Sequence, residues 1–192
     1  METEKLQLLA KQCGKNDRKA QYELYQYCYP ILMSVCYRYY KNNEDSRSAL
    51  NLTFLKVLSH FEKKGEAIVN FDAWIRRLMI NTIIDEHRKN NNYKSVIQLS
   101  HFEKEYEDGM EGVDWNEAED NLNVEELLTL IHELPVAESE VFNLYAIDGY
   151  KHLEIANMLK IPVGTSKWLL SQARLKLKTQ VELLMSDKIV LK

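Results

Sequence analysis

Large apolar side chains recur at the spacing of an α-helix over most of this chain, and few residues interrupt the pattern. In residues 20–64 they return every three or four positions, as in the series Leu24, Tyr27, Ile31 and Val35. The 192 residues include only 6 Gly and 3 Pro, the residues that most often end helices. No run of strand length alternates clearly between apolar and polar side chains. The pattern therefore predicts an all-α protein.

An acidic segment divides the helical pattern into two parts. Residues 100–126 carry 11 acidic side chains and one lysine, whereas the rest of the chain is net positive, although the whole has a net charge of -4. Charges are screened over roughly 8 Å at physiological salt, so a local excess of one sign matters more than the total. We therefore expect two small helical domains, residues 4–95 and 124–186, joined by an acidic linker at residues 96–123.

The sequence disfavours several other classes of protein. No apolar run approaches the roughly 20 residues of a membrane span, and the N-terminus lacks the apolar core of a signal peptide. We therefore expect a cytoplasmic protein without membrane insertion. Cys13, Cys28 and Cys36 form no CxxC pair and are expected to be buried free thiols rather than metal ligands. Since no phosphate-binding glycine loop or nucleophile motif occurs either, we expect no metal, no cofactor and no enzymatic activity.

Individual residues predict where helices begin and end. Pro30 predicts a kink or a helix start within the first domain. Asp45 is suited to cap the helix that follows it. In the second domain Pro135 separates two helices, and Gly149 stands where it can end the second of them.

Residues 152–177 have the pattern of a helix-turn-helix. Such a unit needs a small residue where two helices cross, an apolar residue in a tight turn, and a longer second helix. Ala156 fits the first requirement, Ile161 fits the second, and Thr165 can cap or begin the longer helix. The alternative is an ordinary corner between packed helices whose basic end is simply solvated.

The longer helix has one arc suited to the core and an opposite arc suited to DNA. At about 100° per residue, the core arc contains Ser166, Leu170, Ala173 and Leu177. Because reading helices contact bases from their N-terminal end, the candidates for base contacts are Thr165, Ser166, Lys167, Trp168 and Ser171. Phosphate contacts suit the later residues Arg174, Lys176 and Lys178. For the tryptophan two interpretations stay open: it docks on another domain or partner, or it packs on a thymine methyl group or a sugar.

A helix of the first domain, WIRRLMINTIIDEHRKNNN, combines basic, aromatic and amide side chains. Trp74 offers a stacking surface, and Asn81 offers a donor and an acceptor to a base edge. The basic side chains, which can neutralise phosphates, are Arg76, Arg77, Arg88 and Lys89. The alternative is an amphipathic helix with a core tryptophan and solvated arginines.

Together these motifs resemble the sigma factors of bacterial RNA polymerase, in the extracytoplasmic-function group. Region 2 of that family is matched by Arg38, Tyr39 and Tyr40, then Asp45, Asn51 and Phe54, then Trp74, Arg77, Asn81, Asp85, Arg88 and Lys89. Region 4 is matched by Leu134 and Pro135, residues 141–145, residues 148–150, His152, residues 154–156, residues 164–167, Ala173 and Arg174. The pattern is most similar to that of members from Bacteroidetes-type bacteria.

The resemblance implies a division of labour on a promoter. Region 4 would read the minus-35 element in the major groove, and region 2 would open the minus-10 element and hold an unstacked base. Asn81 matches the position that contacts this base, Asp85 matches a neighbouring position, and residues 63–70 match the loop that helps to enclose the base.

The resemblance also implies protein partners. Core RNA polymerase would bind region 2 at the matching positions Asp45, Asn51, Phe54 and Leu55. The linker would lie in or near the RNA exit path of the polymerase, as linkers of the family do. An anti-sigma factor is the partner expected to hold the activity off.

The chain departs from the family pattern at three places. Acidic side chains that usually bind core polymerase are replaced by Arg47, Ser48 and Leu52. A basic residue after the Leu-Pro motif is replaced by Ser139. In the reading helix, polar or basic residues are replaced by Trp168, Leu169 and Gln172.

Two alternative functions stay open beside that of a sigma factor. Fewer cations predict weaker and less salt-sensitive minus-35 binding, and lost acidic side chains predict weaker polymerase docking. One alternative is a sigma-like regulator that binds protein partners without driving transcription. The other is a plain helix-turn-helix repressor.

Overall fold

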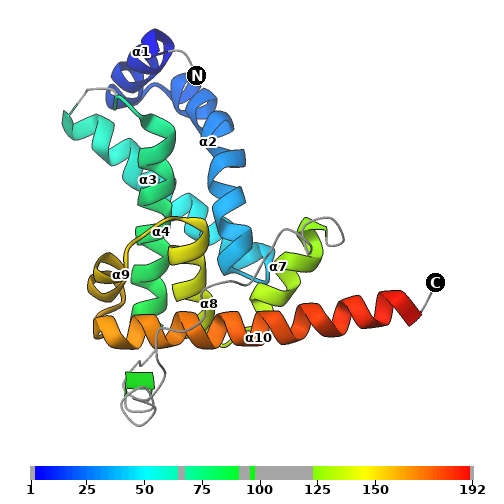
Figure 1. The fold of residues 1–192 in the computed structure, drawn as a ribbon. Helices are drawn as coiled ribbons and strands as arrows, with labels where there is room; N and C mark the ends of the chain where they lie inside the picture. Colours follow the sequence, from blue (N-terminus) through cyan, green and yellow to red (C-terminus); the bar gives the residue numbers. More distant parts are fainter. Residues whose placement is uncertain (1–2, 65–67, 91–95, 98–122, 191–192) are drawn as a thin grey trace. The chain divides into compact units, whose positions relative to one another are not determined.

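The computed structural model describes residues 3–64, 68–90, 96–97 and 123–190. These residues form helices and connecting turns, with no strand among them, so the all-α prediction is confirmed for this part of the chain (Figure 1). The chain divides into two compact units, Met1–His87 and Arg88–Lys192. The predicted acidic linker, residues 96–123, lies almost wholly outside the described residues, so its bounds stay a prediction.

The first unit begins with α1 (Thr3–Gly14), α2 (Arg18–Tyr39) and α3 (Asn43–Lys64), and continues with α4 (Phe71–Asn90), which belongs to this unit as far as His87. The first three helices pack on one another. Their buried apolar side chains include Leu24, Cys28, Leu32, Leu50, Val57 and Phe61, which α4 complements with Ile75, Met79 and Ile83. Gly14 permits the close approach of α1 to α3, because a Cβ at this position would lie 2.8 Å from the Phe61 carbonyl oxygen.

Helix α2 runs through Pro30 without a break, so the predicted helix start at this residue is wrong, while the alternative of a kink stays a prediction. A proline inside a helix removes one hydrogen bond, here the bond to the Gln26 carbonyl. Both residues are exposed, so water can satisfy that carbonyl. The buried residues on either side, Leu24 and Leu32 among them, keep the helix continuous across the gap.

The cap of α3 is Asn42 rather than Asp45, so the predicted capping role of Asp45 is also wrong. The Asn42 Oδ1 accepts a hydrogen bond of 2.8 Å from the backbone N–H of Asp45. The helix begins at Asn43, almost one turn earlier than expected. Asp45 therefore lies in the first turn, where its negative charge is favoured by the helix dipole, and accepts a hydrogen bond of 2.7 Å from Asn42 Nδ2.

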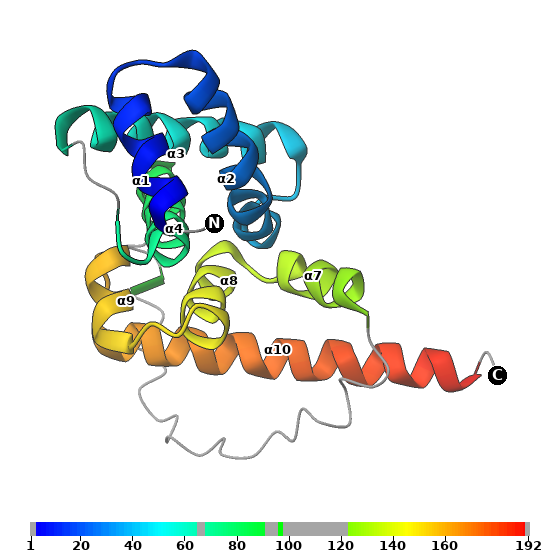
Figure 2. The same ribbon diagram turned by 90° about the horizontal axis from the view of Figure 1, so that it is seen from above.

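The second unit contains α7 (Val124–Glu133), α8 (Val136–Phe142), a π-helical turn η1 (Asn143–Ile147), α9 (His152–Leu159) and α10 (Val163–Val190). Figure 2 shows α7, α8 and α9 along the same side of α10, and each of them packs on that helix. Helix α7 begins at a capping box: Asn123 Oδ1 accepts from the backbone of Glu126 at 2.9 Å, and Glu126 Oε2 accepts from the backbone of Asn123 at 3.0 Å.

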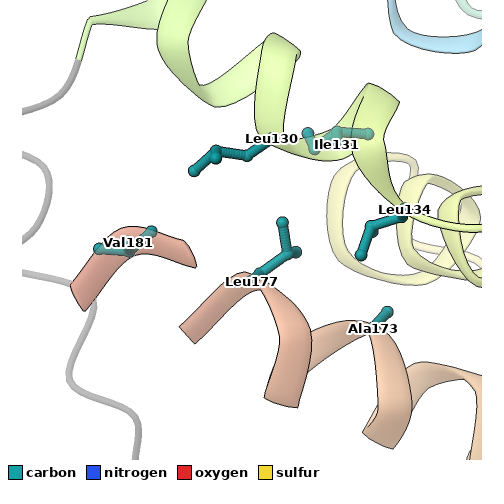
Figure 3. Packing of buried hydrophobic residues seen from close by; sticks show 6 residues of the cluster. All are labelled: Leu130, Ile131, Leu134, Ala173, Leu177 and Val181. Atoms are coloured by element: carbon teal, nitrogen blue, oxygen red, sulfur yellow. The ribbon is translucent and has the colours of Figure 1, made fainter. Parts of the chain in front are cut away.

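A small apolar cluster joins α7 to α10. Figure 3 labels its side chains: Leu130, Ile131 and Leu134 from α7 and its C-cap, and Ala173, Leu177 and Val181 from α10. Because Ala173, Leu177 and Val181 are four residues apart, they lie on one face of α10. The cluster therefore fixes which face of α10 is buried and which remains accessible.

Candidate nucleic-acid interface

The second unit contains the predicted helix-turn-helix, formed by α9, a turn and α10. Helix α9 ends at Lys160, whose φ of 59° turns the chain. Ile161 follows, 6% exposed, with its N–H donating to the Ala156 carbonyl at 3.1 Å. Ala156 is buried as well, so the predicted crossing residue Ala156 and the predicted turn residue Ile161 both occupy their expected places. The predicted helix end at Gly149 is also confirmed, because Gly149 has a φ of 75°.

Two of the predicted base-contacting residues are buried. Thr165 is 3% exposed and Ser166 is fully buried, so the base contacts predicted for these two side chains are wrong in this structure. Helix α10 begins at Val163, which places both residues inside its first turn and toward α9. The Ser166 Oγ lies 3.0 Å from His152 Nδ1, which anchors the start of α10 to the start of α9.

The other predicted residues on α10 are accessible and lie on two neighbouring strips. At about 100° per residue, the first strip faces away from the Ala173 cluster and contains Trp168, Gln172 and Leu175. The second is basic and contains Lys167, Arg174 and Lys178, with Ser171 between the two strips. Trp168, Ser171, Gln172 and Arg174 are half-buried, whereas Lys167, Leu175 and Lys178 are exposed.

The basic side chains of α10 have different surroundings. The Arg174 guanidinium lies 5.7 Å from the centroid of the Tyr145 ring, and that ring stacks on His152 at 4.5 Å. Lys176 is not on the basic strip: its Nζ lies 2.6 Å from Oε1 of the buried Glu138. This ion pair joins α10 to α8, so we expect Lys176 to have a packing role rather than the predicted phosphate contact.

Leu169 is also a core residue, with 1% of its surface exposed. Its departure from the family pattern therefore does not change the surface that α10 presents. The roles of Tyr145 and His152 were not predicted from the sequence, because they depend on η1. A π-helical turn has no clear sequence signature, and it shifts the side chains that follow it.

Helix α4 presents the second candidate surface, which belongs to the first unit as far as His87. Trp74, Arg77, Asn81, Asp85 and Arg88 are three or four residues apart and share one strip of the helix. Arg77 and Asn81 are exposed, and the other three are half-buried. The structure thus brings together five of the seven residues predicted to contact the minus-10 element.

The remaining two residues lie away from this strip. Arg76 is exposed but lies about 100° around the helix from Arg77, on the side of Asp72 and Tyr27. Lys89 is exposed near the end of α4 and lies at the edge of the strip. Of the predicted base-enclosing loop, residues 65–67 lie outside the described residues.

Trp74 has an aromatic support behind it. Its ring lies 5.9 Å from Phe71 in a stacked arrangement and 4.9 Å from His60 on α3, centroid to centroid. Burial lowers the pKa of His60, and the nearby Lys64 charge lowers it further. The neutral imidazole is therefore favoured beside the indole. Since Trp74 is half-buried, part of its surface is packed and part is accessible.

Polar side chains tie α4 to α2 and α3. The Tyr27 hydroxyl donates to Asp72 Oδ1 at 2.7 Å, and the Tyr40 hydroxyl donates to Glu86 Oε2 at 3.0 Å. Burial, followed by the Asp72 carboxylate, raises the pKa of Tyr27 to about 12. Lys56 Nζ donates to Thr82 Oγ1 at 2.8 Å. These contacts fix the rotation of α4, so its strip is held in place.

The residues predicted to bind core polymerase lie on α3. Asp45, Asn51 and Leu55 are exposed, whereas Phe54 is 8% exposed and packs edge-on against Tyr25 at 5.0 Å. Direct docking through Phe54 is therefore wrong: its ring supports the surface from below. Leu55 is 62% exposed and Leu52 is 38% exposed, so the accessible face of α3 is apolar beside Asn51.

The other sequence expectations concern metals and membranes. Cys13, Cys28 and Cys36 are free, buried thiols, as predicted. In the described ranges, no three His, Cys, Asp or Glu side chains come together as a set of metal ligands. Within the same ranges, no helix combines the length and apolarity that crossing a membrane requires.

The fold and these surfaces define a class: an all-α protein of two units, one of which carries a helix-turn-helix and the other a mixed basic and aromatic helix. Comparison with protein families is consistent with this class. The model for sigma-70 region 2 matches residues 24–93, and the model for sigma-70 region 4 matches residues 124–177. Together they span well over half of the chain. The chain therefore belongs to the sigma-70 family, with both regions in the order found in extracytoplasmic-function sigma factors.

Two structures of low sequence identity are among the solved structures that are similar to this chain. One is CnrH in complex with the cytosolic domain of CnrY: 18% identity, 93% of this chain and 97% of that chain covered, TM-score 0.46. The other is the sigma factor RpoE in complex with the anti-sigma factor NepR from Bartonella quintana: 16% identity, 83% and 97% covered, TM-score 0.49. No curated protein matches the sequence.

Proposed function

We propose that this sigma factor directs promoter-specific initiation by core RNA polymerase through two separate DNA surfaces, the strip on α4 and the strips on α10. The observation that carries the proposal is that each surface lies within its matching region, α4 in region 2 and the start of α10 in region 4. A plain repressor needs only the helix-turn-helix. The matched region 2 therefore favours a polymerase subunit over that alternative.

The surface on α4 suits the opening of the minus-10 element. Taking a base out of the stack costs a few kcal/mol, and stacking on an aromatic side chain returns roughly 1–3 kcal/mol per base. Trp74 is an accessible aromatic surface, already backed by Phe71 and His60. Asn81, two turns further along, is exposed and offers both a donor and an acceptor to a base edge. Arg77 and Arg88 on the same strip supply positive charge for the phosphates.

The surface on α10 suits the major groove of the minus-35 element. Lys167, Trp168 and Ser171 lie nearest the N-terminal end of the helix, where reading helices meet bases. Arg174 and Lys178 follow on the basic strip and are placed for phosphates. The aromatic support of Arg174 by Tyr145 limits the positions that its guanidinium can reach.

The exposed face of α3 is the proposed docking surface for core polymerase. Asn51, Leu52 and Leu55 are exposed there, and Asp45 contributes a negative charge at the start of the helix. Contacts with this face would be largely apolar, because Ser48 and Leu52 stand where acidic residues are usual. Arg47 adds a positive charge beside them.

The remaining expectations about partners and location rest on family membership. We propose that an anti-sigma factor holds the protein inactive, that it acts in the cytoplasm, and that it has no cofactor and no catalysis of its own, since the polymerase performs the chemistry. The unusual α3 face favours one second candidate function, a sigma-like regulator that binds protein partners without driving transcription.

Run-off transcription with core polymerase separates these functions. The holoenzyme should give transcripts from promoters that core polymerase alone does not use. Polymerase binding without any transcript would support the regulator. Duplex binding without polymerase association would support a repressor. Within the initiation factor, Leu55→Glu should abolish holoenzyme formation, whereas Leu183→Glu, at another exposed leucine, should leave it intact.

A further inference from the structure

The outward strip of α10 is apolar at its N-terminal end. Trp168, Gln172 and Leu175 lie within about 60° of one another around the helix, opposite the face that Leu177 buries. Trp168 is half-buried and Leu175 is 43% exposed. The tryptophan stands two residues after the buried Ser166, in the second turn of α10, which begins at Val163. The largest side chain on this surface is therefore at the place where a reading helix enters the groove.

The basic strip lies to one side of this apolar strip. Lys167, Arg174 and Lys178 are centred about 100° around the helix from Trp168. A helix in the major groove points its central strip at the base edges and its flanking strip at the phosphates of one wall. With the cations on that wall, the indole would face the floor of the groove. A sugar or phosphate contact would instead place Trp168 where the cations are.

The floor of the major groove has one kind of apolar group. Guanine, adenine and cytosine present donors and acceptors there, whereas thymine also presents its C5-methyl group. The apolar ring face of an indole against polar base edges would remove their water, and only its single Nε1–H donor could replace one of the lost hydrogen bonds, so this contact is costly. Against a methyl group it removes apolar surface of both partners from water, which is favourable.

We propose that Trp168 determines the sequence specificity of minus-35 binding by packing on the C5-methyl group of a thymine. The inference rests on the proposed function, because it requires α10 to enter the major groove of a promoter. It adds the chemical group that is read: a methyl group, which hydrogen-bonding side chains at this position could not recognise.

Replacing thymine by deoxyuridine tests the inference directly, since the exchange removes only the methyl group. The probe is a duplex that the holoenzyme selects from a random pool, remade with deoxyuridine at each minus-35 thymine in turn. Burial of one methyl group corresponds to about a four-fold change in affinity. We expect one thymine at which deoxyuridine weakens binding of the wild-type holoenzyme about four-fold.

The variants give the coupling between the side chain and the methyl group. With Trp168→Ala the same exchange should have no effect, with Trp168→Phe a reduced effect, and with the control Leu183→Ala the full effect. An exchange that changes nothing in the wild type, or that weakens Trp168→Ala equally, overturns methyl reading while promoter binding itself stands. A holoenzyme that selects no duplex at all overturns the proposed function and the inference with it.

Discussion

Leu177→Ala should loosen the second unit by removing the centre of the cluster that holds α7 on α10. Leu177 is 4% exposed and packs with Leu130, Ile131 and Val181. Replacing a buried leucine by alanine costs about 2–5 kcal/mol, depending on how far the neighbours close on the cavity. Ile131 and Val181 each keep 7% exposure, so the cluster lies near the surface and can partly close. We therefore expect about 2–3 kcal/mol.

Hydrogen exchange followed by mass spectrometry is the suitable assay, because it reports on each unit separately. Two-domain proteins give no single unfolding free energy. Peptides from α7 and α10 should exchange roughly 30- to 150-fold faster in Leu177→Ala, while peptides from α2 and α3 keep their rates. The matched control is Leu183→Ala on the same helix, 62% exposed, which should change exchange little.

Equal exchange in these two variants would refute the reasoning, since it would mean that burial in this cluster does not stabilise α10. Faster exchange in α2 and α3 would also contradict it, because the first unit does not depend on the α7–α10 cluster for its core.

Three further predictions concern charge. Burial raises the pKa of the Cys28 thiol from 9.0 to about 12, so the folded chain holds this proton more tightly than the unfolded chain. The contribution of Cys28 to stability should therefore be full below pH 9 and fall as the pH rises toward 12. Thiol labelling at pH 8 should be slow until urea unfolds the protein. Lys178→Gln should reduce the slope of log affinity against log salt concentration for the minus-35 duplex by the equivalent of about one phosphate contact. Titrations at several salt concentrations measure this slope, and an unchanged slope would mean that Lys178 does not contact the DNA. Lys176→Met should not change that salt dependence, but it should destabilise the second unit by about 1–2 kcal/mol. The substitution leaves the buried Glu138 without its cation, and the exposure of the lysine keeps this cost small. Amide exchange rates measure the loss of stability, and unchanged rates would contradict the packing role.

The sequence predicted the fold class well because helix periodicity and turn chemistry are local signals. Ala156, Ile161 and Gly149 fit their positions by size or backbone freedom alone, so their roles could be predicted without the fold. The role of Pro30 could not be predicted in this way, because whether a proline ends a helix depends on the tertiary packing around it. Asn42 and Asp45 are both good caps, and three residues separate them, so the sequence alone could not choose between them.

The candidate site was predicted less completely, because exposure depends on neighbouring elements. Ser166 was assigned both to the core arc and to the bases, and the contact with His152 on α9 decides for the core. The place of Lys176 on its helix suits a phosphate contact, but in the fold its Nζ lies 2.6 Å from Glu138 Oε1 on α8. Phe54 fits the family pattern for polymerase docking, yet the Tyr25 ring covers it. The strip on α4 was predictable, since five of its residues follow simple helical spacing.

Promoter opening by the Asn81→Ala holoenzyme tests the central claim most directly. Run-off transcripts are measured with core polymerase and either wild-type protein or Asn81→Ala, on a duplex promoter and on the same promoter with a preformed bubble at the minus-10 element. The account predicts promoter-specific transcripts from the wild type on both templates, and from Asn81→Ala only on the bubble. Transcripts from Asn81→Ala on the duplex at the wild-type level would contradict it, as would a wild-type protein that supports no promoter-specific transcript at all.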